Sequence, residues 1–499
     1  MKTKAIKSPL NQRRAGILLH ISSLPNKEHV GDLGSEAYRF VDFLHEIGAT
    51  VWQTLPINAP HADNSPYQAL SAFAGNPDFI SIETLHAQGL LLRKSDTSVK
   101  TTKTQLLSNA YESFKMRALK KEQQAFNRFC KKQAHWLDDF ALFMALKKKF
   151  NQVGWQFWLE AYKNRDVEAL KFARKELSLE IASAQFTQYI FFMQWADLKA
   201  YAAKKNVYLF GDIPIFVAYD SADVWANPHL FKLDANKNMA VVAGVPPDYF
   251  SATGQRWGNP HYDWQAMAAD DYQWWVQRLA LQNELFDIVR IDHFRGLEAA
   301  WEIPATEDTA INGQWVLAPG DALLAAILKA LPKICLVAED LGIITDEVNA
   351  LRNNYHLPGM KILQFAFSGE EENPYLPKNI EENNVVYTGT HDNDTTVGWF
   401  NALDDGQRSH LMDYLQSNLQ SSNTNHAVQI PKDLIEIALA SKANLAIIPM
   451  QDILHLDGSH RMNTPGTCDG NWHWRFHWKQ LTATLQIEMT QMIKNTGRH

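Results

Sequence analysis

The sequence has little cysteine, no long apolar run and no large excess of charge of one sign. Its three cysteines, Cys130, Cys335 and Cys468, are spread over 499 residues, form no C-x-x-C pair and cannot all be bridged within the chain. No stretch of about eighteen apolar residues occurs, and no apolar export segment follows the basic residues 1–16. We therefore expect a cytoplasmic protein with reduced thiols that is neither exported nor embedded in a membrane.

The charge balance and the absence of several motifs exclude further classes of protein. A formal net charge of -7 gives no long-range attraction for nucleic acid or anionic lipid, so we expect neutral ligands. The basic run Lys147, Lys148 and Lys149 follows an apolar helical pattern and is predicted to be a solvated helix face. The chain has no phosphate-binding loop, no H-E-x-x-H, no Gly-rich dinucleotide fingerprint and no G-x-S-x-G turn, so we expect no cofactor.

What the sequence does contain is a series of eight short apolar runs bounded by breaker residues, which we predict to be strands. They are apolar throughout, as expected of strands covered on both faces, and helical patterns lie between several of them. This succession predicts an α/β fold of the (β/α)8 barrel type. The predicted strands are residues 15–20, 50–55, 207–213, 287–291, 334–338, 361–365, 385–388 and 445–450.

Two intervals are too long for simple connections within one barrel that spans residues 1–499. After the second strand, residues 58–205 are predicted to form a mostly helical subdomain. After the third strand, residues 218–271 are rich in aromatic residues, Gly and Pro, and are predicted to be loops over the mouth of the barrel. The tail from Trp472 is predicted to be a last helix, without a C-terminal β-sandwich domain.

Carboxylates follow four of the predicted strands, at the end of a barrel where active sites are built. Asp340 and Asp394 are interpreted as turn formers or helix caps. Breaking an acetal with retention requires an acid and a carboxylate nucleophile about 5–5.5 Å apart, which neighbouring strands can supply. The candidate motifs are Gly211-Asp212-Ile213-Pro214, Arg290-Ile291-Asp292-His293, Ala338-Glu339-Asp340 and Thr390-His391-Asp392-Asn393-Asp394.

Two of these carboxylates fit the two roles. Arg290 lies two residues before Asp292, hence on the same strand face, where its cation favours an ionised nucleophile. Glu339 has to hold a proton near neutral pH, which a drier setting favours. A divalent metal held by the carboxylates of the same rim is an alternative, but no tight ligand spacing points to it, and we predict no metal site.

Further motifs make the sequence similar to the 4-α-glucanotransferases of the amylomaltase (disproportionating enzyme) family over nearly its whole length. The strand-end motifs alone are typical of the broader α-amylase-like clan, whereas the loop at 244–260 is specific to this family. The motifs that carry the resemblance are Ser65-Pro66-Tyr67-Gln68, Gln194-Trp195, Gly211 to Val217, Gly244 to Pro260, Arg290 to Gly296, Ala338 to Gly342, Gly389 to Thr395 and Arg461 to Thr467.

The resemblance implies Asp292 as nucleophile, Glu339 as general acid/base and Asp392 as the residue that stabilises the transition state. It also implies that Tyr67 stacks beneath the reacting sugar, that Asp212 lies at the same subsite, and that His391 and Arg290 help Asp392. A loop with Asp248, Tyr249 and Trp257 is expected to arch over the cleft so that amylose wraps around it, and Asn463 is expected to line the cleft.

The implied reaction transfers 1,4-α-glucan segments from maltooligosaccharides, amylose or glycogen-derived glucans to the 4-hydroxyl of glucose or another glucan. Two alternatives stay open at this point: an amylase-type retaining hydrolase and a non-catalytic glucan-binding protein on a degenerate barrel. The second predicts the loss of Asp292, Glu339 or Asp392, and all three are present. We expect a monomer that binds no nucleic acid and no membrane.

Overall fold

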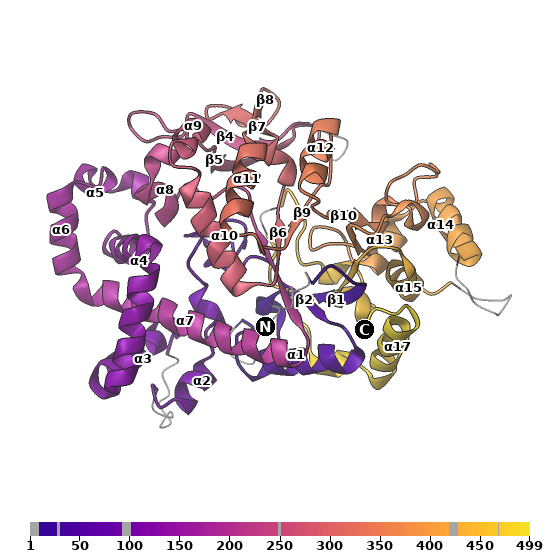
Figure 1. Ribbon diagram of the computed structural model, residues 1–499, viewed down its shortest axis with the longest axis horizontal. Coiled ribbons are helices and arrows are strands. Elements are labelled where there is room, and N and C mark those ends of the chain that lie inside the picture. The colour runs from indigo at the N-terminus through magenta and orange to yellow at the C-terminus, as the bar shows by residue number, and fades with distance from the viewer. Residues whose placement is uncertain (1–8, 27–29, 92–100, 248–250, 419–427, 468) are drawn as a thin grey trace, which may run out of the picture.

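The computed structural model describes residues 9–26, 30–91, 101–247, 251–418, 428–467 and 469–499 (Figure 1). Eight parallel strands surround a common axis in the order β10-β11-β12-β1-β2-β3-β6-β9, so that neighbours in the barrel are also neighbours along the chain. This arrangement confirms the predicted (β/α)8 barrel. The strands are β1 (Arg14–Leu18), β2 (Val51–Gln53), β3 (Tyr208–Ile213), β6 (Ile288–Ile291), β9 (Leu336–Ala338), β10 (Gly359–Ile362), β11 (Asn384–Tyr387) and β12 (Leu445–Pro449).

All eight predicted strands are found, and no boundary moves by more than three residues. The sixth differs most, because β10 ends at Ile362 and residues Leu363–Phe365 form a 3-10 helix instead. There the Gln364 side chain donates to the backbone oxygen of Asp394 at 2.9 Å. Apolar composition alone cannot show this change from strand to helical turn.

The barrel closes between β9 and β10, partly through a carboxylate. Ala338 N–H donates to the backbone oxygen of Pro358 at 2.9 Å, and Met360 N–H donates to Asp340 Oδ1 at 2.6 Å. The other oxygen of Asp340 forms an ion pair with Arg352. Asp340 is therefore not the simple turn former predicted from the sequence, because it takes the place of a backbone acceptor at the seam of the barrel.

Inside the barrel, the side chains change from apolar to polar towards the carboxyl ends of the strands. Because alternate residues of a strand point to one face, the inward residues of β6 are Ile288 and Arg290, with Asp292 next in line. In β3 they are Tyr208, Phe210 and Asp212, and the register pairs Asp212 with Arg290. The inward side chains are therefore apolar in the middle of the barrel, at Phe210 and Ile288, and charged at its carboxyl end, at Asp212 and Arg290.

The helices that surround the barrel follow the predicted pattern. The first of them is α1 (Ser35–Ile47), which buries Phe40, Leu44 and Ile47 and ends at Gly48, whose φ of 83° is a left-handed C-cap. The others are α10 (Gln273–Leu285), α11 (Gly320–Ala330), α12 (Asp346–Asn354), α13 (Thr396–Ala402), α14 (Asp405–Asn418), α15 (Lys432–Ala440), α16 (Met450–Ile453) and α17 (Ala483–Asn495).

The interval between β2 and β3 is largely helical and extends to one side of the barrel (Figure 1). It contains α2 (Ile82–Ala87), α3 (Lys103–Arg117), α4 (Lys120–Lys149), α5 (Glu160–Lys163), α6 (Val167–Glu176) and α7 (Ser178–Lys204). The prediction of a solvated basic face on α4 is wrong for Lys147. Its side chain is only 5% exposed and forms a 2.6 Å ion pair with Asp220, whereas Lys148 is 71% exposed.

The interval 218–271 is more regular than the predicted loops. Besides α8 (Ala222–Ala226) and α9 (Trp264–Ala268), it supplies β4 (Val241–Val245) and β5 (Gln255–Pro260). These strands pair with β7 (Ala299–Pro304) and β8 (Gln314–Leu317), which follow barrel strand β6, in an antiparallel sheet of order β5-β4-β7-β8. Because its strands come from two separate insertions, this small sheet cannot be found from either insertion alone.

The chain after β12 contains helices and loops in its described part. A 3-10 turn, Trp478–Gln480, precedes α17, which packs against α1, and residues 450–467 and 469–499 contain no strand. None of the helices in the described ranges has the length and apolar content needed to cross a bilayer.

The seam of the barrel gives a first prediction. Replacing Asp340 with Ala leaves the Met360 N–H and the Arg352 guanidinium without their acceptor, and the free energy of unfolding should fall by about 2–4 kcal/mol. Urea unfolding followed by circular dichroism measures this loss. Asp413→Ala, at an exposed position of α14, is the control and should change the value by less than about 0.5 kcal/mol. Equal effects of the two substitutions would contradict the role given to Asp340.

Candidate active site

A cleft of about 970 Å³ opens at the carboxyl ends of the barrel strands, between the strand-end loops and the small sheet. It contains the three carboxylates predicted to be catalytic, Asp292, Glu339 and Asp392. About half of the side chains around them are aromatic or amide, and these come from both insertions, from the segments after β6, β10 and β11, and from the segment after β12. They include Tyr67, Phe216, Trp257, Asn259, Trp315, Phe365, Tyr375, Trp399, Asn463 and Trp472.

The strand register brings Asp292 and Glu339 next to each other. Ile291 of β6 pairs with Ala338 of β9, so the residues that follow, Asp292 and Glu339, leave adjacent strands at the same level. Strands in a sheet lie about 4.7–4.9 Å apart. Two backbone bonds hold this junction together: Glu339 N–H donates to Ile291 O at 3.1 Å, and Phe294 N–H donates to Glu339 O at 3.0 Å.

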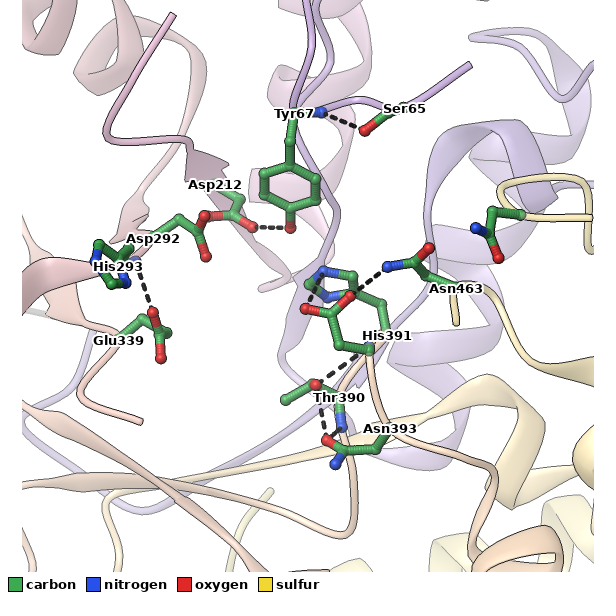
Figure 2. Close-up of polar contacts among 12 residues, drawn as sticks. Ser65, Tyr67, Asp212, Asp292, His293, Glu339, Thr390, His391, Asn393 and Asn463 are labelled. Carbon is green, nitrogen blue, oxygen red and sulfur yellow. Dashed lines mark hydrogen bonds and ion pairs between the residues drawn. The ribbon is translucent and has the colours of Figure 1, made fainter. Parts of the chain in front are cut away.

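A buried guanidinium joins two carboxylates beneath the cleft. Arg290 donates to Asp212 Oδ2 at 2.6 Å and forms an ion pair with Asp292, with 2.7 Å between Nη2 and Oδ1, and its side chain is 4% exposed. The hydroxyl of Tyr67 donates to the same oxygen of Asp212 at 2.7 Å (Figure 2). Burial and the negative charge of Asp212 raise the pKa of Tyr67 well above its usual value, so the phenol keeps the proton that it donates.

The surroundings of Asp292 act on its pKa in opposite directions. Burial and the nearby carboxylates, Asp212 first among them, raise the pKa of Asp292 well above its usual value. The Arg290 cation opposes this increase. Of the neighbouring groups, Arg290 is therefore the one that favours the ionised and nucleophilic form of Asp292.

Glu339 has a different environment on the neighbouring strand. Its Oε2 accepts the backbone N–H of His293 at 2.6 Å and its Oε1 accepts that of Leu341 at 2.9 Å. Burial raises the pKa of Glu339 above its usual value, although Arg290 and these backbone donors act in the opposite direction. The carboxyl group thus retains its proton to higher pH than an exposed glutamate does.

The third carboxylate, Asp392, lies in the loop after β11 and also lines the cleft. Asn463 donates to Asp392 Oδ1 at 2.7 Å, and His391 Nε2 lies 3.3 Å from Oδ2. The His391 ring stacks on Tyr67 with 5.3 Å between ring centroids and 13° between their planes. Burial lowers the pKa of His391, so at neutral pH the ring is uncharged and can donate one hydrogen bond.

Comparisons with known proteins agree with this geometry. The family model described as 4-alpha-glucanotransferase, glycoside hydrolase family 77, matches residues 19–482. The chain belongs to this family. It is similar to the 4-alpha-glucanotransferases of Synechocystis, at 45% identity over 98% of this chain and 99% of that protein, and of Thermus thermophilus, at 44% identity over 97% and 99%.

Among solved structures, the chain resembles an amylomaltase from Streptococcus agalactiae in complex with acarbose. The TM-score is 0.92 at 35% identity, and the match covers 98% of this chain and 100% of that one. The amylomaltase of Corynebacterium glutamicum, at 17% identity and a TM-score of 0.76, supports the fold alone. The protein is thus a glucanotransferase on a (β/α)8 barrel.

Not all of the predicted substrate-binding residues of this glucanotransferase reach the cleft. Tyr67, Arg290 and Asn463 line it. Trp257 lines it from β5, where its ring meets His293 edge-to-face with centroids 4.9 Å apart. The side chain of Asp212, by contrast, has no exposed surface and acts behind the wall of the cleft.

His391 is also largely covered, being 8% exposed. Asp248 and Tyr249 lie outside the described residues. In the part of the chain that the structure describes, no three His, Cys, Asp or Glu side chains are grouped so that they could hold a metal ion.

One residue behind the site was not predicted. Asp452, from α16 after β12, is buried, and its Oδ2 accepts the hydroxyls of Thr388 at 2.5 Å and Thr396 at 2.7 Å. Its Oδ1 accepts the Thr396 N–H at 2.8 Å. Thr388 and Thr396 flank the loop that carries His391 and Asp392, so Asp452 fixes both ends of this loop. Asp452 follows β12 closely, but none of the sequence motifs includes it, because its role depends on contacts with a loop from another part of the chain.

These contacts make Asp452 a positioning residue, and the variant Asp452→Asn tests this role. The amide keeps the size of the side chain but has one acceptor oxygen in place of two, so the loop is held less firmly. Displacement of a stabilising group can cost about a hundredfold in rate, and kcat and kcat/KM should fall together by about ten- to a hundredfold. Thr396→Ser, which keeps the hydroxyl, is the matched control. Wild-type kcat in Asp452→Asn would refute the assignment.

Proposed function

We propose that this enzyme transfers 1,4-α-glucan segments between maltooligosaccharides, amylose or glycogen-derived chains and glucose by a retaining double displacement. Asp292 is the nucleophile, Glu339 the general acid/base and Asp392 the transition-state stabiliser. The observation that carries the proposal is the register of β6 and β9, which sets Asp292 and Glu339 at adjacent strand ends. The spacing of adjacent strands fits the separation of about 5–5.5 Å that retaining enzymes need between their carboxyl groups.

In the first step, an oxygen of Asp292 attacks the anomeric carbon and the glycosidic carbon–oxygen bond breaks. Glu339 donates its proton to the departing 4-oxygen of the glucan, which leaves with both electrons of the broken bond. The raised pKa of Glu339 supports this role, because the proton must still be present near neutral pH.

In the second step, Glu339, now a carboxylate, accepts the proton of an acceptor 4-hydroxyl. The oxygen of this hydroxyl attacks the same anomeric carbon and releases Asp292 as a carboxylate. Each step inverts the carbon once, so the new linkage has the α configuration of the old one. Atoms and charges balance without a cofactor, since the proton given in the first step is recovered in the second.

The groups around Asp292 support the reacting sugar in two ways. Tyr67, whose ring rests on His391, offers a fixed aromatic surface at the subsite of the reacting ring. Asp392, oriented by Asn463 and by a bond from Arg461 to its backbone oxygen at 2.9 Å, is available for the hydroxyls of that ring.

Asp212 and the remaining predicted residues take other roles. Asp212 positions Arg290 and Tyr67, because its own oxygens are covered. Trp257 contacts the glucan chain from β5, and Asp248 and Tyr249 are proposed to do so from the segment before that strand.

Transfer and hydrolysis share this chemistry and differ in what intercepts the glycosyl ester. Transfer is favoured by the many aromatic and amide side chains of the cleft, which suit a second sugar better than a lone water. A non-catalytic glucan-binding role is disfavoured because all three carboxylates face one cleft. We further propose a cytoplasmic monomer that binds neither nucleic acid nor membranes, in line with its charge and cysteine content.

The distinction between transfer and hydrolysis leads to a direct test with maltotriose. We expect glucose to appear together with maltopentaose and longer products, while the number of reducing ends stays constant, because each transfer replaces one linkage by another. Chromatography of the product ladder and a reducing-sugar assay measure this. Glucose and maltose without any elongated product, with a rise in reducing ends, would show a hydrolase.

The acid role of Glu339 is tested by Glu339→Gln. The natural glucan should lose about 10²- to 10⁴-fold in kcat/KM, because its leaving group must be protonated. An α-maltosyl fluoride needs no proton, so the variant should release fluoride in a rapid burst close to one per enzyme and then stall for want of a base. Equal losses for glucan and fluoride would contradict the role.

The same residue sets the pH dependence. Since the pKa of Glu339 is raised, the protonated form persists above the usual range of a glutamate, and kcat/KM for glucan should fall only as the pH rises through that raised value. The same decrease at high pH should be absent from the rate at which α-maltosyl fluoride glycosylates the enzyme, because that step needs no proton from Glu339.

A further inference from the structure

A tryptophan at the rim of the cleft has no part in the mechanism above. Trp315, in the edge strand β8 of the small sheet, is 39% exposed and lines the cleft. Ile343, also on the cleft wall, is 55% exposed. Exposure of apolar surface to water is unfavourable and is relieved when the surface is buried. Exposed rings at the rim of a binding cleft are therefore expected to meet a ligand.

The ring of Trp315 is held in a defined orientation. The Arg295 guanidinium lies over it at 3.7 Å from the ring centroid, and Trp301 meets it at 5.2 Å with 66° between the planes. Arg295 is itself buried and donates to the backbone oxygen of Ile343. A ring fixed in this way loses little conformational entropy when a ligand stacks on it.

Trp315 is connected through Arg295 to the segment that follows Glu339, because Arg295 lies over its ring and donates to the backbone oxygen of Ile343. Its support, Arg295, follows Asp292 by three residues, and Ile343 follows Glu339 by four. Glu339 protonates the leaving oxygen, whereas Tyr67, His391 and Asn463 lie on the opposite side of Asp292 (Figure 2). Because the acceptor enters where the leaving group departed, the Trp315 side is the acceptor side.

We propose that Trp315 is a binding platform for a glucose unit of the acceptor glucan, beyond the unit that supplies the attacking 4-hydroxyl. This inference rests on the proposed catalytic roles, which define the acceptor side. The ligand is an uncharged 1,4-α-glucan, whose ring faces carry C–H groups that pack on an indole while its hydroxyls stay in water. Trp315 thereby gives the enzyme its preference for longer acceptors.

The test measures transfer from α-maltosyl fluoride to acceptors of increasing length. Fluoride departs without using the acceptor side, and sulfur-linked maltooligosaccharides serve as acceptors that cannot act as donors. In the wild type, kcat/KM for the acceptor should rise from glucose to the thio-linked tetrasaccharide. In Trp315→Ala it should be unchanged for glucose and about five- to tenfold lower for the tetrasaccharide.

Three further variants distinguish stacking from a structural effect. Trp315→Phe keeps an aromatic face and should retain most of the rise with length, whereas Trp315→Leu keeps apolar volume without a flat ring and should lose it. Leu317→Ala, at a 76% exposed position of the same strand that does not line the cleft, should behave as the wild type. Losses of the same size for glucose and tetrasaccharide, or no loss for either, would overturn the proposal.

A binding measurement separates this proposal from the transfer reaction itself. If the wild type gave its glycosyl group only to water, the transfer reaction would be contradicted, and titration calorimetry with the thio-linked tetrasaccharide would still decide the role of Trp315. A Kd about five- to tenfold weaker in Trp315→Ala than in Leu317→Ala is the expected result. Equal Kd values would refute the platform.

Discussion

The site depends on one buried cation. A guanidinium inside a barrel is tolerated only when carboxylates satisfy it, and Arg290 has two, Asp212 from β3 and Asp292 from the end of its own strand. The register of β3 with β6, which pairs Asp212 with Arg290, therefore also fixes Asp292, and the register of β6 with β9 places Glu339 beside it. Tyr67 donates a hydrogen bond to Asp212, so the aromatic ring proposed to support the sugar is also connected to this ion-pair network.

Two carboxyl groups at adjacent strand ends have different environments, because their immediate neighbours differ. Asp292 is in direct contact with Arg290, whose charge offsets part of the cost of burying its own. Glu339 has two backbone N–H donors and no cation within bonding distance among the described residues, and burial raises its pKa. This difference of environment supports the proposed assignment of Asp292 as nucleophile and Glu339 as acid.

The sequence allowed the barrel to be predicted, and also the meeting of Asp292, Glu339 and Asp392 in one cleft, because both depend on local signals: short apolar runs, and polar residues immediately after them. It did not reveal features that need contacts between distant segments. Burial of Lys147 follows from Asp220, 73 residues away, and the full burial of Asp212 follows from Tyr67 and Arg290 closing over it. The small sheet joins two insertions, and Asp452 acts on a loop from behind it. In each case the burial or the role of a residue depends on a partner that is distant in the sequence, so the residue and its neighbours in the sequence do not reveal it.

The two sides of the cleft are built by different parts of the fold, which has a consequence for specificity. The groups proposed to contact the reacting ring come from barrel strand ends and from loops fixed by buried polar contacts such as those of Asp452. Trp257 and Trp315 come from the two edge strands, β5 and β8, of a sheet added onto the barrel. Edge strands tolerate side-chain changes better than buried registers, because each has one neighbouring strand instead of two. The length of glucan that the enzyme prefers can therefore change at the rim while the chemistry in the barrel stays the same.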